Sequence, residues 1–85
     1  MVYDIRIKKS ALKELEKFPR QAIVAIDNKI LGLEIDPRSS GFKKLTAIPD
    51  MFRIRCGDYR IIYTINDNEN IVEILKIKHR KEAYK

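Results

Sequence analysis

The sequence predicts an α+β domain in which two N-terminal helices form a hairpin on one face of a small, mostly antiparallel sheet. Three patterns predict it. Apolar and polar residues alternate over residues 2–7, apolar residues recur at helical spacing over residues 11–33, and short β-branched runs separated by turn residues fill residues 42–77. The expected order is β-α-α-β-β-β-β. With 85 residues, the chain is expected to form a single domain, residues 1–85.

The first strand is expected over residues 2–7, where the alternation turns Ile5 and Ile7 toward the core. Ser10 follows closely, and a serine hydroxyl can accept a hydrogen bond from the unpaired N–H groups at the start of a helix. We therefore predict that Ser10 caps a first helix that begins at Ala11.

Each predicted helix has one apolar side. In the first helix this side consists of Leu12, Leu15 and Phe18. Pro19 ends that helix because proline has no backbone N–H, and its fixed φ suits the first turn of the second helix. The apolar stripe of the second helix consists of Ile23, Ile26, Ile30 and Leu33. Residues 36–41 are rich in turn formers and connect the helices to the rest of the sheet.

The remaining chain predicts strands over residues 42–46, 51–56, 59–65 and 71–77. Gly57 and Asp58 fill a two-residue turn, and residues 67–70 form the next one. The last strand has apolar residues on both faces, which indicates a position inside the sheet rather than at its edge.

Positive charge is concentrated in the second half of the chain. Residues 1–37 contain seven Lys and Arg against six Asp and Glu, a balance of +1, whereas residues 38–85 contain eleven against six, a balance of +5. Such an asymmetry is typical of a domain that binds a polyanion. The other interpretation is a solubilising surface, which usually mixes both signs as the first half does.

The composition also bears on location. Cys56 is the only cysteine, so no internal disulfide can form, and a reducing, cytoplasmic location is expected. No apolar run reaches the length that spans a membrane. The first residues enter an alternating pattern directly, which is not the pattern of a signal peptide.

Three arginines are expected to share one face of the sheet. Arg53 and Arg55 alternate with apolar residues, so they lie on the same side of their strand, about 7 Å apart. Arg60 begins the neighbouring strand just after the two-residue turn. Like charges this close repel one another, and a phosphate relieves the repulsion because guanidinium binds it through two hydrogen bonds. The alternative is a solvated face whose arginines lie over aliphatic neighbours.

The basic tail, residues 79–85, is compatible with a helix and follows the last strand closely enough to reach the arginine face. Arg80 adds a fourth cation there. Tyr84 either stacks on an unpaired base or packs back on the sheet. His79 is the only histidine, and it serves either as an acid or base near neutral pH or in a purely structural role.

Other chemistries are disfavoured by the residues present. One cysteine and one histidine cannot make a zinc site, and the three glycines do not form a phosphate-binding loop. The acidic residues do not cluster as they do in metal-dependent nucleases. We therefore expect neither a metal nor a cofactor.

Two stretches resemble the RelE/ParE toxin superfamily. Residues 51–63, MFRIRCGDYRIIY, are similar to its central signature, and residues 79–84, HRKEAY, are similar to its C-terminal His-Arg and Tyr motif. ALKEL at residues 11–15 and KKL at residues 43–45 also fit, so that the resemblance covers essentially the whole chain.

This resemblance implies a microbial-ribonuclease-like fold and the RelE activity. A RelE-like toxin enters the ribosomal A site and cleaves the mRNA there, by attack of the ribose 2′-hydroxyl on the neighbouring phosphate. The expected partners are accordingly the ribosome, mRNA and a cognate antitoxin, and no membrane.

The family motif also implies a role for each matching residue. Arg53 and Arg55 match two basic residues of the active site, and Arg60 matches the arginine that stabilises the transition state. Arg80 matches the arginine that assists the leaving oxygen, and Tyr84 matches the base-stacking tyrosine. Further cations are expected to bind RNA or the ribosome: Lys43, Lys44, Lys78 and Lys81.

The general base stays open at this point. Some family members carry lysines where Arg53 and Arg55 stand, and arginine effectively never loses its proton. Either His79 contributes, or catalysis rests on phosphate electrostatics and on orientation of the 2′-hydroxyl.

Two other functions compete with this one. A ParE-like toxin would inhibit DNA gyrase through protein contacts without nuclease activity, but such members tend to lack the full basic and tyrosine set. A nucleic-acid-binding module without catalysis would tolerate Arg→Lys changes, whereas a site that orients phosphate through planar guanidinium groups would not.

Overall fold

The computed structural model describes residues 2–38, 42–45 and 51–83. Its elements are β1 (Asp4–Ile7), α1 (Lys9–Glu16), α2 (Arg20–Ile35), β2 (Lys43–Lys44), β3 (Met51–Cys56), β4 (Tyr59–Asn66), β5 (Ile71–His79) and α3 (Arg80–Ala83). The predicted order β-α-α-β-β-β-β is therefore confirmed, and a short helix follows it.

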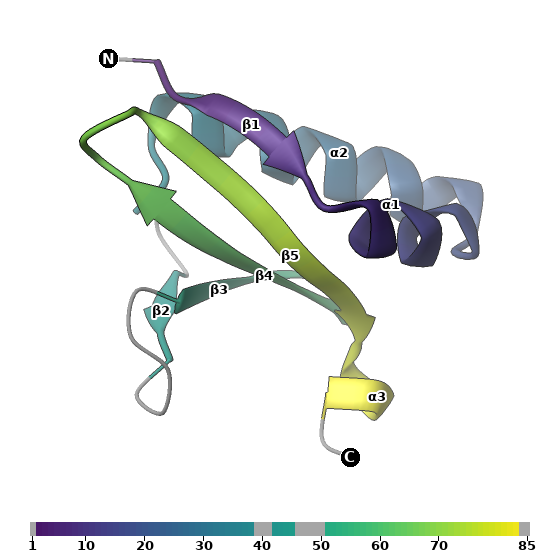
Figure 1. The fold of residues 1–85 in the computed structure, drawn as a ribbon. Coiled ribbons are helices and arrows are strands. Elements are labelled where there is room, and N and C mark those ends of the chain that lie inside the picture. The colour runs from purple at the N-terminus through teal and green to yellow at the C-terminus, as the bar shows by residue number, and fades with distance from the viewer. Residues whose placement is uncertain (1, 39–41, 46–50, 84–85) are drawn as a thin grey trace.

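The sheet has five strands in the order β1-β5-β4-β3-β2. After the two helices the chain enters the sheet at β2 and returns strand by strand through antiparallel neighbours, until β5 lies parallel to β1 (Figure 1). The sheet is mostly antiparallel, as predicted, and β1 and β5 form its parallel pair. β5 lies between β1 and β4, as its two-sided apolar pattern predicted.

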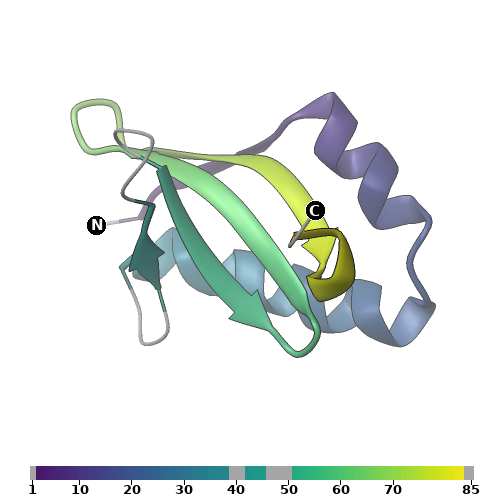
Figure 2. The ribbon, with the colours of Figure 1, turned by 90° about the horizontal axis from the view of Figure 1, so that it is seen from below.

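Both long helices cover the same face of the sheet, α1 beside β5 and α2 across β1 and β3. Figure 2 shows that the two helices of the predicted hairpin open from their short connection as a V. Pro19 explains the geometry because its extended ψ of 148° turns the chain sharply before α2 begins. No helix in the described ranges is long and apolar enough to cross a membrane.

The core lies between these helices and the covered face of the sheet. Its central residue is Tyr63 of β4, which has no solvent exposure. The other buried side chains alternate along the strands or recur at helical spacing: Ala11, Leu15, Ile26, Ile30, Leu33, Ile54, Ile61, Val72, Ile74 and Ile77. Because these buried side chains face the helices, the charged residues that alternate with them along the strands point to the opposite, open face of the sheet.

The start of α1 differs from the prediction. Ser10 lies inside the helix and does not cap it, because the chain already turns at Lys8, whose carbonyl accepts the Leu12 N–H at 3.0 Å. Leu12 was predicted to face the core, yet its side chain is 42% exposed. Ala11 and Leu15, one helical turn apart, are the buried pair instead.

β5 contains an irregularity that changes which side chains face outward. Ile62 of β4 pairs with Lys76, but the next residue of β4, Tyr63, pairs with Ile74. Leu75 is therefore an extra residue, a β-bulge that shifts the alternation of everything after it. Ile77 consequently lies in the core and Lys78 faces outward, and the strand continues through His79, two residues beyond its predicted end.

Strand β2 is shorter than predicted. Of the described residues 42–45, Lys43 and Lys44 form the strand, and Leu45 continues the contact through a 2.9 Å hydrogen bond from its N–H to the Met51 carbonyl. Thr46 lies outside the described residues.

Candidate active site

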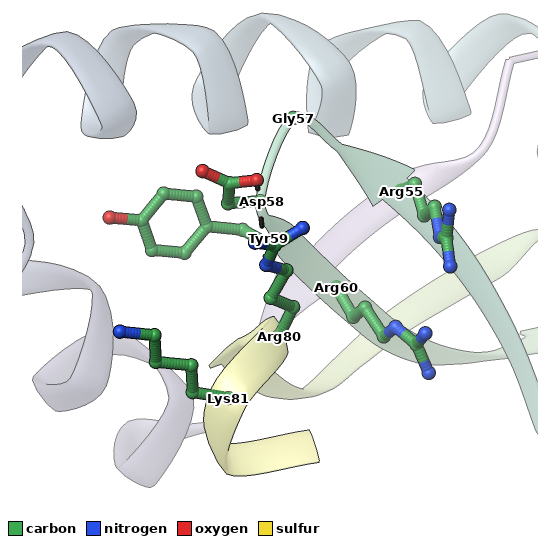
Figure 3. Close-up of a pocket in the computed structure, with 7 residues that line it drawn as sticks. All are labelled: Arg55, Gly57, Asp58, Tyr59, Arg60, Arg80 and Lys81. Carbon is green, nitrogen blue, oxygen red and sulfur yellow. Dashed lines mark ion pairs between the residues drawn. The ribbon is translucent and has the colours of Figure 1, made fainter. Parts of the chain in front are cut away.

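Arg55 and Arg60 lie directly opposite each other on β3 and β4. The two-residue turn between these strands makes this possible, because Gly57 adopts a φ of +60° that a type II′ turn requires at its first central position. Cross-strand partners project to the same side of a sheet. Both side chains accordingly extend over the open face in the same direction (Figure 3).

Arg60 is the more firmly held of the two. It stands on β4, the central strand, beside the fully buried Ile61, and its own side chain is half-buried. Its Nε atom is buried from solvent. Arg55, on the other side of the pair, is exposed. A charged group with such a fixed stem is preorganised for an anionic ligand, since little side-chain entropy remains to be lost on binding.

Arg80 reaches the same place from the C-terminal helix. Its N–H donates a 2.7 Å hydrogen bond to the Asp58 carbonyl, so α3 begins against the β3–β4 turn. Its Nε also lies 3.9 Å from an Asp58 carboxylate oxygen, and both side chains are 64% exposed. An ion pair that exposed contributes little to stability. The backbone hydrogen bond is therefore what positions Arg80.

These groups surround a cavity of about 230 Å³. The residues that line it are Arg55, Gly57, Asp58, Tyr59, Arg60, Arg80 and Lys81. Four of them carry positive charge and one, Asp58, carries negative charge, so the cavity suits an anion with several acceptor oxygens. The cavity thus brings Arg55, Arg60 and Arg80 together.

Arg53 lies on the same face but outside the cavity. It pairs in register with Lys43 on one side and with Ile62 on the other. Lys44, in contrast, pairs with Phe52, whose ring packs against the core, so it projects to the helix side. Of the two adjacent lysines, only Lys43 thus lies on the arginine face.

The lysines near the C-terminus occupy different positions. Lys81 lines the cavity. Lys78 pairs in register with Arg60, and its Nζ lies 2.5 Å from a Glu14 carboxylate oxygen on α1. Lys78 thus links the open face to the first helix.

His79 does not join the arginines. It pairs with Tyr59, and the two rings meet edge to face with centroids 5.2 Å apart. Tyr59 in turn packs on Phe18, on the helix side of the sheet. The Nδ1 atom of His79 accepts a 3.2 Å hydrogen bond from the Lys81 N–H. His79 lies apart from the arginines because the bulge at Leu75 turns it away from the open face.

Three cavity residues, Gly57, Asp58 and Tyr59, were not predicted, and one predicted residue is not described. The sequence predicts only a turn at Gly57 and Asp58, although Asp58 lies one residue from Tyr59 and two from Arg60, which puts it beside the site. For Tyr59 the sequence predicts a place in a strand and no part in the site. Tyr84 lies outside the described residues, so its contribution stays a prediction.

Comparison with known proteins identifies the family. Residues 5–84 match the family described as ParE toxin of type II toxin-antitoxin system, parDE. The chain is also 30% identical over 86 residues to Toxin RelG of Mycobacterium tuberculosis, with 100% of this chain and 99% of that protein covered.

Solved structures show the same fold. The archaeal RelE–RelB complex of Pyrococcus horikoshii contains a chain with a TM-score of 0.82 and 33% identity, over 94% of this chain and 97% of that one. The toxin–antitoxin complex RelBE2 of Mycobacterium tuberculosis gives a TM-score of 0.83 at 29% identity, over 94% of this chain and 100% of that one. The predicted RelE-type fold is therefore confirmed.

Proposed function

Because this chain belongs to the ParE toxin family within the RelE/ParE superfamily of type II toxins, we propose that it is an endoribonuclease that cleaves mRNA in the ribosomal A site. The observation that carries the proposal is the meeting of Arg55, Arg60 and Arg80 at one cavity on the open face. Its substrate would place the protein in the cytoplasm.

The proposed reaction needs only the RNA's own atoms and the surrounding cations. The ribose 2′-hydroxyl loses its proton and attacks the adjacent phosphorus, the bond to the 5′ oxygen breaks, and that oxygen takes up a proton. The products are a 2′,3′-cyclic phosphate and a 5′-hydroxyl. Negative charge develops on the phosphoryl oxygens in the transition state, and fixed guanidinium donors stabilise it there.

Each arginine has a distinct part in this proposal. Arg60, with its buried stem, donates to the developing phosphoryl charge. Arg80, which is docked on the β3–β4 turn, stabilises the leaving oxygen. Arg55 orients the phosphate, and Arg53 contributes from the neighbouring position on the strand. Tyr84 is proposed to stack on the exposed base.

Proton removal is proposed to depend on orientation and electrostatics rather than on an arginine base, because the arginine pKa is too high. His79 stays a candidate only if a rearrangement brings it to the open face. The guanidinium groups supply the positive charge that a metal ion would otherwise provide, so we propose a metal-independent reaction.

Mapping of cuts by primer extension tests the function directly. On a translated message we expect cuts within the codon held in the A site, and none on the same RNA without ribosomes. Replacing the 2′-hydroxyl upstream of a cut with hydrogen should abolish that cut. Cleavage that persists on the deoxy substrate, or that a chelator abolishes while the ribosomes stay intact, would contradict the proposed reaction.

A second function has specific support, since the matching family is described by the parDE system. A ParE-like toxin would inhibit DNA gyrase without cutting RNA. A supercoiling assay with purified gyrase separates the two functions. Inhibition of supercoiling together with intact mRNA would favour the gyrase function and refute the nuclease.

The proposed partner is a cognate antitoxin, as in the RelE–RelB complexes that share this fold. An acidic or amphipathic segment that becomes ordered on binding would neutralise the arginine face or displace Tyr84. Co-expression with the adjacent reading frame should yield a stable complex and restore growth. If it does neither, the antitoxin proposal fails.

A further inference from the structure

The open face of the sheet carries two parallel rows of side chains that the strand register defines. The inner row is Arg55, Arg60 and Lys78, and its two arginines line the cavity. The outer row is Lys43, Arg53, Ile62 and Lys76, which lie side by side on β2, β3, β4 and β5. Two residues along a strand separate the rows, a distance of about 7 Å.

The cations of the outer row are not neutralised by any residue that the structure describes. Within the described part of the chain, the side chains of Lys43, Arg53 and Lys76 make neither an ion pair nor a hydrogen bond. The next row beyond them contains both signs of charge, because Glu73 there pairs with Thr64 on one side and with Arg6 of β1 on the other. The surface that carries positive charges alone is therefore two rows deep.

The centre of the outer row is apolar. Ile62 is half-buried and points to the open face between Arg53 and Lys76. An apolar patch with cations on both sides matches one nucleotide, whose base or ribose packs on the patch while its phosphates meet the charges.

We propose that the outer row is a second nucleotide site, which binds the RNA strand one nucleotide away from the phosphate held in the cavity. The inference rests on the proposed ribonuclease function and deepens it, because it gives the strand a path across the sheet. The spacing of the rows is similar to the distance between neighbouring phosphates of a single RNA strand. Lys76 and Ile62 then become substrate-binding residues.

Binding of a fluorescent, single-stranded 2′-O-methyl RNA, measured by anisotropy over a series of KCl concentrations, tests the proposal. Such an RNA cannot be cut because its 2′-oxygen is blocked. Lys43→Gln and Lys76→Gln should each lower the slope of log affinity against log salt by about 0.7, the value for one phosphate contact on a single strand. Ile62→Thr should weaken binding without changing the slope, because it removes apolar contact and no charge.

Lys13→Gln is the matched control, since it removes the same charge from an exposed position on α1. Its slope should equal that of the wild type. Wild-type slopes for Lys43→Gln and Lys76→Gln would overturn the proposal, and so would an equal loss in Lys13→Gln, which would indicate a general charge effect.

Cleavage by the same wild-type preparation separates this inference from the proposed function. Cleavage of translated mRNA with unaltered slopes in the outer-row variants overturns the second nucleotide site alone. Lowered slopes without any wild-type cleavage support the site and refute the nuclease.

Discussion

The hydroxyl of Tyr63 donates a 2.6 Å hydrogen bond to the backbone carbonyl of Pro37. Tyr63 is fully buried on β4, three residues beyond Arg60, and Pro37 follows the end of α2. The bond therefore ties the end of the helical layer to the strand that carries the proposed catalytic arginine. Burial raises the pKa of Tyr63 to about 12, so the phenol stays protonated and remains a donor at neutral pH.

Tyr63→Phe should lower stability while leaving the chemistry intact. The variant leaves the buried Pro37 carbonyl without its hydrogen-bond donor, which costs about 1 to 3 kcal/mol. For a domain of this size each kcal/mol lowers the Tm by about 4 to 8 °C, which thermal unfolding will measure. Tyr59→Phe is the control, because the Tyr59 hydroxyl makes no hydrogen bond within the described residues. An equal loss in both variants would contradict the assigned bond.

The same tyrosine predicts a loss of stability at alkaline pH. Its folded pKa of about 12 lies above the usual value of 10.0, so between these values the native state holds a proton that the unfolded state releases. The stabilisation is thus fully present below pH 10 and is lost as the pH rises toward 12. The difference in unfolding free energy between the wild type and Tyr63→Phe should shrink over this window. A difference in unfolding free energy that stays constant over this window would contradict the prediction.

The lowered pKa of Asp67 predicts a loss of stability at acidic pH. The Arg38 guanidinium binds its carboxylate through hydrogen bonds of 2.8 and 3.2 Å, the Tyr3 hydroxyl donates another of 2.7 Å, and together they hold the pKa of Asp67 below its usual value. A lowered folded pKa contributes stability above the unfolded pKa, and this contribution is lost as the pH falls through the folded pKa. Asp67→Asn should reduce the loss of unfolding free energy as the pH falls. An unchanged pH dependence in this variant would contradict the role assigned to Asp67.

Arg60→Ala should remove most of the turnover. Loss of one preorganised donor to a developing oxyanion costs about 100- to 1000-fold in rate. Single-turnover cleavage at saturating toxin measures the chemical step without binding. Arg60→Lys should remain well below the wild type, because an ammonium cannot form the planar pair of hydrogen bonds. Arg20→Ala, at an exposed position on α2, provides the control, and wild-type turnover of Arg60→Ala would place the active site elsewhere.

Lys43→Ala and Lys44→Ala should differ although the residues are adjacent. Lys43 lies opposite Arg53 on the open face, whereas Lys44 lies opposite Phe52 on the helix side. Association with ribosomes and its salt dependence should therefore weaken in Lys43→Ala and stay near wild type in Lys44→Ala, with the chemical step intact in both. Equal effects would show that their faces do not matter. The sequence alone had predicted the same role for both lysines.

Much of the candidate site follows from local rules. Alternation along β3 and a two-residue turn are enough to place Arg55 beside Arg60, and both features are visible in the residues 51–60 alone. The position of His79 could not be predicted in this way. A single extra residue, Leu75, reverses the faces of every later residue in β5, and nothing in the local pattern marks it.

The sequence by itself determined the order of the elements, the inward residues of most strands and the concentration of cations in the second half, because periodicity and composition are local properties. Only the tertiary structure decided the V of the helices, the docking of Arg80 on Asp58 and the two rows of the open face. These depend on contacts between residues far apart in the chain, and such contacts are selected by how well the buried side chains pack together.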